Sequence, residues 1–206
     1  MTLQQLRAGF DNFSYVLYCQ VQQKAALVDP GFDATAPLGF ISSNKLLLEY
    51  IIVTHYHRDH SSETKTVKKR FPSSKIVASK EDGKKLDIQP DVFVSDGSHL
   101  MVGTVRLDFL FTPGHTPGGV CIIVDNKALL TGDTLFIGDC GRNDLPGGSL
   151  RDMFTTLQQK IMGLPDELLV YPGHDYGDKP FDTLGNQKRT NKTLLAKTLK
   201  EFSAIP

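Results

Sequence analysis

The sequence predicts a single α/β domain, residues 1–206, in which helices cover mixed β-sheets. Three observations support this prediction. A length of 206 residues suits one sizeable core, no repeat or low-complexity linker divides the chain, and short β-branched or aromatic runs alternate with fewer helical segments. Because most helical segments come singly between runs, a layered sandwich is favoured over a purely parallel sheet.

The individual elements follow from local patterns. Runs rich in β-branched and aromatic residues favour extended backbone, and turn residues bound them. Helices are predicted from apolar periodicity and from cap residues such as Ser61 and Ser149. Strands are expected at 15–19, 25–28, 50–53, 75–78, 92–94, 105–111, 120–124, 128–130 and 168–171, and helices at 36–47, 62–70, 149–162 and 188–202.

The amino-acid composition limits the kinds of molecule that this protein is expected to bind. Lys plus Arg and Asp plus Glu number 23 each, so no global charge favours nucleic acid or an anionic membrane. No apolar run approaches a membrane span, and no signal-peptide core follows the first residues. The three cysteines include no C-x-x-C pair and fit reduced thiols. We therefore expect a cytoplasmic monomer or homodimer that binds a small molecule, not nucleic acid or a membrane.

Metal-ligand side chains follow four of the predicted strands, in short loops rich in Gly, Pro and Thr. We expect the carboxyl ends of these strands to lie at one edge of the sheets, where open α/β sheets tend to bind ligands. Imidazoles and carboxylates without a thiolate suit zinc, iron or manganese in an open, catalytic site. Ordinary polar residues at strand ends are the alternative, but five of the six histidines lie in these loops. The side chains are His55, His57, Asp59, His60, His115, Asp133 and His174.

The run Thr54 to His60, T-H-Y-H-R-D-H, resembles the T-H-x-H-x-D-H signature of the metallo-β-lactamase superfamily. His115, Asp133 and His174 match its later motifs in order and surroundings, so the resemblance covers almost the whole chain. It implies a four-layer αββα sandwich with the site along one edge. It also assigns His55, His57 and His115 to a first metal, and Asp59, His60 and His174 to a second, with Asp133 bridging the two.

The resemblance also implies roles around the metals. Val28-Asp29-Pro30-Gly31 matches the family's V-D-x-G motif, in which the Asp supports the ligands from behind. An Asp at an ordinary strand-to-turn boundary is the alternative for Asp29. Two divalent ions, zinc or iron with manganese as a third option, would provide a bound hydroxide near neutral pH. Asp59 would orient that nucleophile and accept its proton, which makes it the candidate catalytic residue.

The stretch from Gly132 to Asp144 resembles the glyoxalase II and persulfide dioxygenase branches of the superfamily more than the antibiotic-degrading one. Both branches act on glutathione-linked sulfur compounds, which implies a small-molecule substrate of that kind. Arg142 stands where these families place a cation near the substrate, and a guanidinium can hold a carboxylate with two hydrogen bonds. An exposed arginine without a ligand is the alternative.

The complete ligand set favours a metal-dependent hydrolase that cleaves a thioester. The main alternative is a persulfide dioxygenase with a single iron held by His55, His115 and Asp133, since two imidazoles and one carboxylate suit oxygen chemistry. The Cys140 to Asp144 run, C-G-R-N-D, is similar to the C-G-R-T-D of those dioxygenases. A lactonase and a non-catalytic metal-binding protein remain further alternatives.

Overall fold

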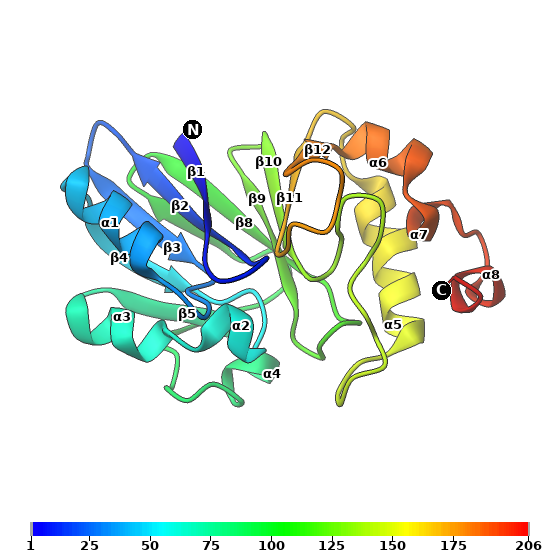
Figure 1. Cartoon of the computed structure of the whole chain (residues 1–206), viewed down its shortest axis with the longest axis horizontal. Helices are drawn as coiled ribbons and strands as arrows, with labels where there is room; N and C mark the ends of the chain where they lie inside the picture. The colour runs from blue at the N-terminus through cyan, green and yellow to red at the C-terminus, as the bar shows by residue number, and fades with distance from the viewer. Residues whose placement is uncertain (1, 206) are drawn as a thin grey trace.

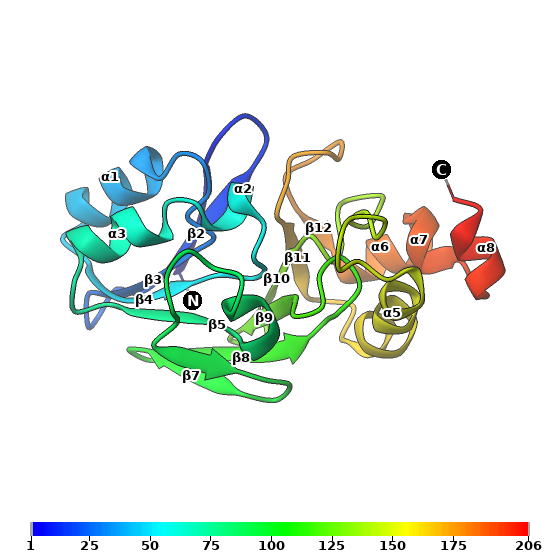
Figure 2. The same cartoon turned by 90° about the horizontal axis from the view of Figure 1, so that it is seen from below.

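Two β-sheets pack face to face, and each is covered by helices on its outer side, in a computed structural model that describes residues 2–205 (Figures 1 and 2). Helices α1 (Thr35–Ser43) and α3 (Thr64–Arg70) cover the first sheet. Helix α5 (Leu150–Thr155) and the helices that follow it cover the second. The predicted four-layer αββα sandwich is therefore confirmed.

Each sheet has six strands, and the chain completes the first before it begins the second. The first has the order β1-β2-β3-β4-β5-β6, with parallel pairing from β3 to β6. Its strands are β1 (Thr2–Arg7), β2 (Phe13–Cys19), β3 (Lys24–Val28), β4 (Leu47–Ile52), β5 (Lys75–Ser79) and β6 (Val92–Val94).

The second sheet has the order β12-β11-β10-β9-β8-β7 and is antiparallel except between β10 and β11. Its strands are β7 (His99–Val102), β8 (Val105–Phe111), β9 (Val120–Val124), β10 (Ala128–Gly132), β11 (Leu169–Pro172) and β12 (Asp182–Thr183).

Strand direction explains why one edge of the sandwich collects the polar loops. Strands β3, β4 and β5 run parallel, so their carboxyl ends share an edge. Strands β8 and β10 are both antiparallel to β9, and β11 is parallel to β10, so these three also point the same way. The backbone bonds from Val120 N to Thr54 O and from Phe13 N to Gly173 O, at 3.0 and 2.8 Å, join the two sheets at this edge.

Apolar side chains fill three separate cores. The largest lies between the sheets and includes Leu17, Ile52 and Phe109, all buried. A second joins the first sheet to α1 and α3, and a third joins the second sheet to the C-terminal helices. These cores hold the strands from which the polar loops project. None of the helices in the part of the chain that is described has the length and apolarity to cross a bilayer.

Some predicted elements were wrong in extent. The helix expected at 188–202 is three short helices, because Asn191 and Thr198 accept hydrogen bonds from the backbone of the residues that follow them and so begin new helices. The helix expected at 36–47 ends at Ser43, and β4 begins at Leu47. The helices are α6 (Leu184–Thr190), α7 (Lys192–Leu195) and α8 (Leu199–Ser203).

The helix expected at 149–162 is present, with Ser149 accepting a hydrogen bond from Asp152 N at its start. It continues beyond α5 as a π-helical turn (η1, Thr156–Lys160) and a 3-10 turn (η2, Ile161–Gly163). Ser61 does not cap a helix, which corrects that prediction. Ser61 ends the short helix α2 (Arg58–Ser61), and its hydroxyl donates to the carbonyls of Tyr56 and His57.

Candidate metal centre

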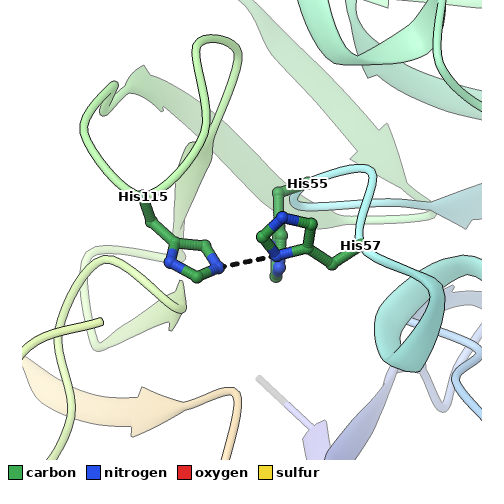
Figure 3. A group of neighbouring side chains, drawn as sticks. All are labelled: His55, His57 and His115. Atoms are coloured by element: carbon green, nitrogen blue, oxygen red, sulfur yellow. Dashed lines mark hydrogen bonds between the residues drawn. The ribbon is translucent and has the colours of Figure 1, made fainter. Parts of the chain in front are cut away.

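Three histidines meet at the junction of the two sheets (Figure 3). His55 and His57 come from the loop after β4, and His115 comes from the loop after β8. One nitrogen from each ring lies within 4.8 Å of the others, and His115 Nε2 is 2.8 Å from His57 Nδ1. We call these residues the tri-histidine set.

The surroundings of the tri-histidine set favour rings that can bind a metal through a ring nitrogen. The Arg142 carbonyl accepts a hydrogen bond from His115 Nδ1 at 2.6 Å, which leaves Nε2 of that ring unprotonated in its neutral form. Burial, followed by the charges of the other histidines, lowers the pKa of His57 to about 4. Burial also holds the pKa of His55 well below its usual range. Neutral imidazoles of this kind are metal ligands.

A second group, Asp59, His60 and His174, lies beside the first, and we call it the Asp-His-His set. Asp59 and His60 are on α2, whereas His174 follows β11. His60 Nε2 and His174 Nε2 are 3.2 Å apart, and Asp59 Oδ2 lies 3.5 and 3.3 Å from them. Ligands of one ion stand about 3 to 4 Å from one another when each is about 2 Å from the metal, so this spacing suits one ion.

Asp133 lies between the two sets, at the end of β10. Its Oδ2 is 3.4 Å from His115 Nε2 and 3.3 Å from His174 Nε2, and its Oδ1 is 3.3 Å from His60 Nε2. Gly173 leaves room for this carboxylate, because a Cβ atom there would stand 2.4 Å from Asp133 Oδ1. One carboxylate thus faces both sets, which is the position of a bridging ligand.

The donor atoms fit divalent cations. His55 Nε2 and Asp133 Oδ1 are buried and have no hydrogen-bond partner among the residues described. Such buried atoms are costly unless another group satisfies them. Although burial lowers it, Asp133 and Asp59 raise the pKa of His174 to about 9. The carboxylates therefore favour positive charge at this point, which a metal ion would supply.

Asp29 supports both sets from behind. This buried carboxylate accepts hydrogen bonds from Thr54 N and Thr54 Oγ1, both at 2.7 Å, and from His60 Nδ1 at 3.0 Å. A group of Asp29, His55 and His60 also has the spacing of a metal site. We assign Asp29 no metal, because its oxygens are already engaged by these three donors.

A cavity of about 590 Å³ opens on both sets, a size that admits a small ligand. Its apolar wall includes Phe136, Ile137 and Leu145. Arg142 lines it too, with its side chain 62% exposed and paired with Asp144 at 2.8 Å. The predicted substrate contact therefore lies at the cavity, although its charge is already partnered.

Some residues at the site were not predicted from the sequence. Asn12, in the hairpin between β1 and β2, donates to Asp59 Oδ2 at 3.0 Å, and Asp11 Oδ1 lies 3.3 Å from His174 Nδ1. Tyr176 stacks on the His174 ring with a centroid distance of 4.6 Å and lines the cavity. Asp82 accepts hydrogen bonds from Tyr56 N, in the loop after β4, and from Thr116 Oγ1, in the loop after β8. Proximity to His174 could have suggested Tyr176, but no sequence pattern marks the others.

An αββα sandwich with the tri-histidine set and the Asp-His-His set at one edge defines a class of metal-dependent enzymes. The profile of the Metallo-beta-lactamase superfamily matches residues 8–174. This chain belongs to the metallo-β-lactamase superfamily.

Relatives within the superfamily carry two different activities. The mitochondrial persulfide dioxygenase ETHE1 of Homo sapiens is 33% identical over 196 residues, covering 94% of this chain and 75% of the relative. A probable hydroxyacylglutathione hydrolase of Schizosaccharomyces pombe is 30% identical over 201 residues, covering 95% and 73%. The crystal structure of ETHE1 from Myxococcus xanthus aligns with a TM-score of 0.88 at 27% identity, covering 100% of this chain and 92% of that one. The specific reaction is therefore not decided by similarity.

Proposed function

We propose that this protein is a two-metal hydrolase that cleaves a thioester of a small thiol such as glutathione. The observation that carries the proposal is the Asp-His-His set, whose three donors lie within 4.8 Å of one another beside an equally compact tri-histidine set. A single iron held by His55, His115 and Asp133 would leave the Asp-His-His set without an ion. Two sets bridged by one carboxylate suit a hydrolase in which two ions share the site.

In this proposal, His55, His57 and His115 would hold one divalent ion, Asp59, His60 and His174 would hold the other, and Asp133 would serve both. When bound, such ions, zinc or iron with manganese as a third option, lower the pKa of water and polarise a substrate carbonyl. Every donor here is nitrogen or oxygen, which suits all three metals.

Asp59 is the residue we assign to proton transfer. Although burial raises it, hydrogen bonding with His174 and the charge of His60 hold the pKa of the Asp59 carboxyl well below its usual range. The carboxylate is therefore ionised and able to orient an attacking water, although its lowered pKa makes it a weak acceptor for the proton of that water. Asn12 fixes one oxygen of Asp59 by its 3.0 Å hydrogen bond, so the carboxylate keeps its direction.

The cavity supports a thioester with an anionic arm. Arg58 and Arg142 both line it, and guanidinium groups bind carboxylates. Phe136, Ile137 and Leu145 offer apolar contact to an acyl chain. A thiolate leaves without strong acid assistance, so the proposed reaction needs no general acid beyond solvent.

The second candidate is the persulfide dioxygenase reaction with one iron. The observation that favours it is the 33% identity to human persulfide dioxygenase ETHE1 over 94% of this chain. His55, His115 and Asp133 would form its two-imidazole, one-carboxylate site. The two reactions share a superfamily and a site but differ in metal number and in their need for oxygen.

One experiment separates them. In the first assay, the protein loaded with Zn²⁺ or Fe²⁺ is mixed with an S-acyl-glutathione, and the release of thiol is measured. In the second assay, the Fe²⁺-loaded protein is mixed with glutathione persulfide, and the uptake of oxygen is measured. The proposal expects thiol release with either metal, lost in Asp59→Asn, and little oxygen uptake. Strong oxygen uptake without thiol release would replace the hydrolase with the dioxygenase.

A further inference from the structure

Asp82 is a buried carboxylate that neither set of donors includes. It lies on the short helix α4 (Lys80–Gly83), after β5, and the residue is 1% exposed. Its Oδ2 accepts hydrogen bonds from Tyr56 N at 3.1 Å and from Thr116 Oγ1 at 2.7 Å, while its Oδ1 accepts one from Gly118 N at 2.7 Å. One carboxylate thus joins two loops that are about sixty residues apart in sequence.

The three donors all belong to the loops of the tri-histidine set. Tyr56 stands between His55 and His57 in the chain, and Thr116 directly follows His115. Among the described residues, Asp82 makes no hydrogen bond to any member of the Asp-His-His set. Asp82 is therefore connected to one half of the metal centre and not to the other.

The surroundings of Asp82 are shaped for this carboxylate. A Cβ atom at Gly118 would stand 2.5 Å from Asp82 Oδ1 and 2.4 Å from Ser79 Oγ, so the loop comes this close only because residue 118 is glycine. Burial raises the pKa of Asp82, which means that burial disfavours the ionised form of this carboxyl group. Buried charged groups persist when hydrogen bonds satisfy them, as three do here.

We propose that Asp82 is a positioning residue that holds the β4 and β8 loops together and so sets the spacing of His55, His57 and His115 for a metal ion. The inference rests on the proposed metal centre, but it concerns metal binding and not the substrate. Residues that orient metal ligands from behind change metal affinity by about 10- to 100-fold when they are substituted.

The Asp82→Asn substitution would nearly keep the shape of the side chain, but the new amide could not accept all three bonds. If its oxygen faced Gly118 N, its N–H groups would point at Tyr56 N, and the loop of His55 and His57 would lose its anchor. If its oxygen faced Tyr56 N, the N–H groups would point at Gly118 N, and the loop of His115 would lose its anchor. Either orientation releases one loop of the tri-histidine set.

The test is a Zn²⁺ titration of the metal-free wild type and of metal-free Asp82→Asn. The NMR signals of the individual imidazole rings show which set binds the ion, and competition with a chelator gives the affinity. We expect the affinity of the tri-histidine set to fall by about 10- to 100-fold, with the Asp-His-His set unchanged. Ser79→Ala is the matched control, because it removes the hydrogen bond that Asp82 N donates to Ser79 Oγ but keeps the carboxylate. It should lower thermal stability without a selective loss of metal.

The outcomes distinguish the proposals. If Asp82→Asn lowered metal affinity equally at both sets, together with a fall in unfolding temperature, Asp82 would have only a structural role and the inference would be wrong. Unchanged metal affinity would also overturn the inference. A wild type that binds no ion would overturn the metal centre and this inference together. If Asp82→Asn does not fold, Thr116→Val removes one of the three bonds and should give the same selective loss on a smaller scale.

Discussion

Asp29 gives the sharpest prediction about the metal centre. The perturbation is Asp29→Asn, which keeps the shape of the side chain and suits the positive φ of 52° at this position, a conformation that asparagine tolerates well. Asp29 is buried and accepts three hydrogen bonds, from Thr54 N, Thr54 Oγ1 and His60 Nδ1. A carboxylate only accepts, so it places the His60 proton on Nδ1 and leaves Nε2 free for a metal when the ring is neutral.

The amide introduced by Asp29→Asn could not serve all of these donors. With its oxygen on Thr54 N, the amide would donate to His60 Nδ1 and move the ring proton to Nε2, which faces His174 at 3.2 Å. With the opposite orientation, Thr54 N would lose its acceptor. A hydrogen bond to a charged group is worth about 1.5 to 3 kcal/mol, and each 1.4 kcal/mol is a factor of about ten in affinity. We expect metal affinity at the Asp-His-His set to fall by about 10- to 100-fold.

The assay is a Zn²⁺ titration against a chromophoric chelator, with urea unfolding of the metal-free proteins measured beside it. Asp91→Asn is the control, since Asp91 also accepts a backbone hydrogen bond, from Ile76 N at 2.8 Å, but touches neither donor set. Affinity in Asp29→Asn equal to that of the control, with equal unfolding midpoints, would refute the assignment of Asp29 as the support of His60.

Three more outcomes are expected. Asp133→Ala should lose metal from both sets and abolish turnover, because Asp133 faces His115, His60 and His174 within 3.4 Å, and a variant with two bound ions and full activity would contradict its bridging role. Arg142→Ala should raise KM for an anionic substrate by about tenfold at unchanged kcat, and an unchanged KM would remove Arg142 from the substrate site. Because burial raises the pKa of Cys140 to about 12, its thiol should resist iodoacetamide at pH 8 and react about tenfold faster per pH unit above that. Mass spectrometry that finds rapid labelling of native protein at pH 8 would show that the pKa of this thiol is not raised.

Nine of the twelve strands in the described part of the chain were predicted, because local chemistry decides them, whereas β1, β7 and β12 were not among the expected strands. Residues 105–111 and 120–124 are apolar or β-branched runs between turns, and they appear as β8 and β9 with those bounds. The C-terminal helices were harder. Apolar periodicity continues through residues 188–202, but the side chains of Asn191 and Thr198 bond to nearby backbone and divide the predicted helix into three.

The candidate site was predictable to the extent that it follows strand ends. Five histidines and Asp133 stand directly after apolar runs or in the dense first loop, so their residue types and order were visible in the chain. The supporting residues were not. Asn12 reaches Asp59 from 47 positions away, and Asp82 reaches Thr116 from 34 positions away, and neither lies in a pattern that points to its partner.

The sequence by itself determined most of the strands and the kinds of donor at the site, because strand propensity and ligand chemistry are properties of individual residues and short runs. The four αββα layers were implied by the resemblance of its motifs to the superfamily. Only the tertiary structure showed which donors lie close together, that Asp133 faces both sets, and that Asp82 hydrogen-bonds to both tri-histidine loops. Those facts depend on strand direction and on the packing of one sheet against the other. Contacts between distant segments are set by the whole core and not by any local stretch of chain.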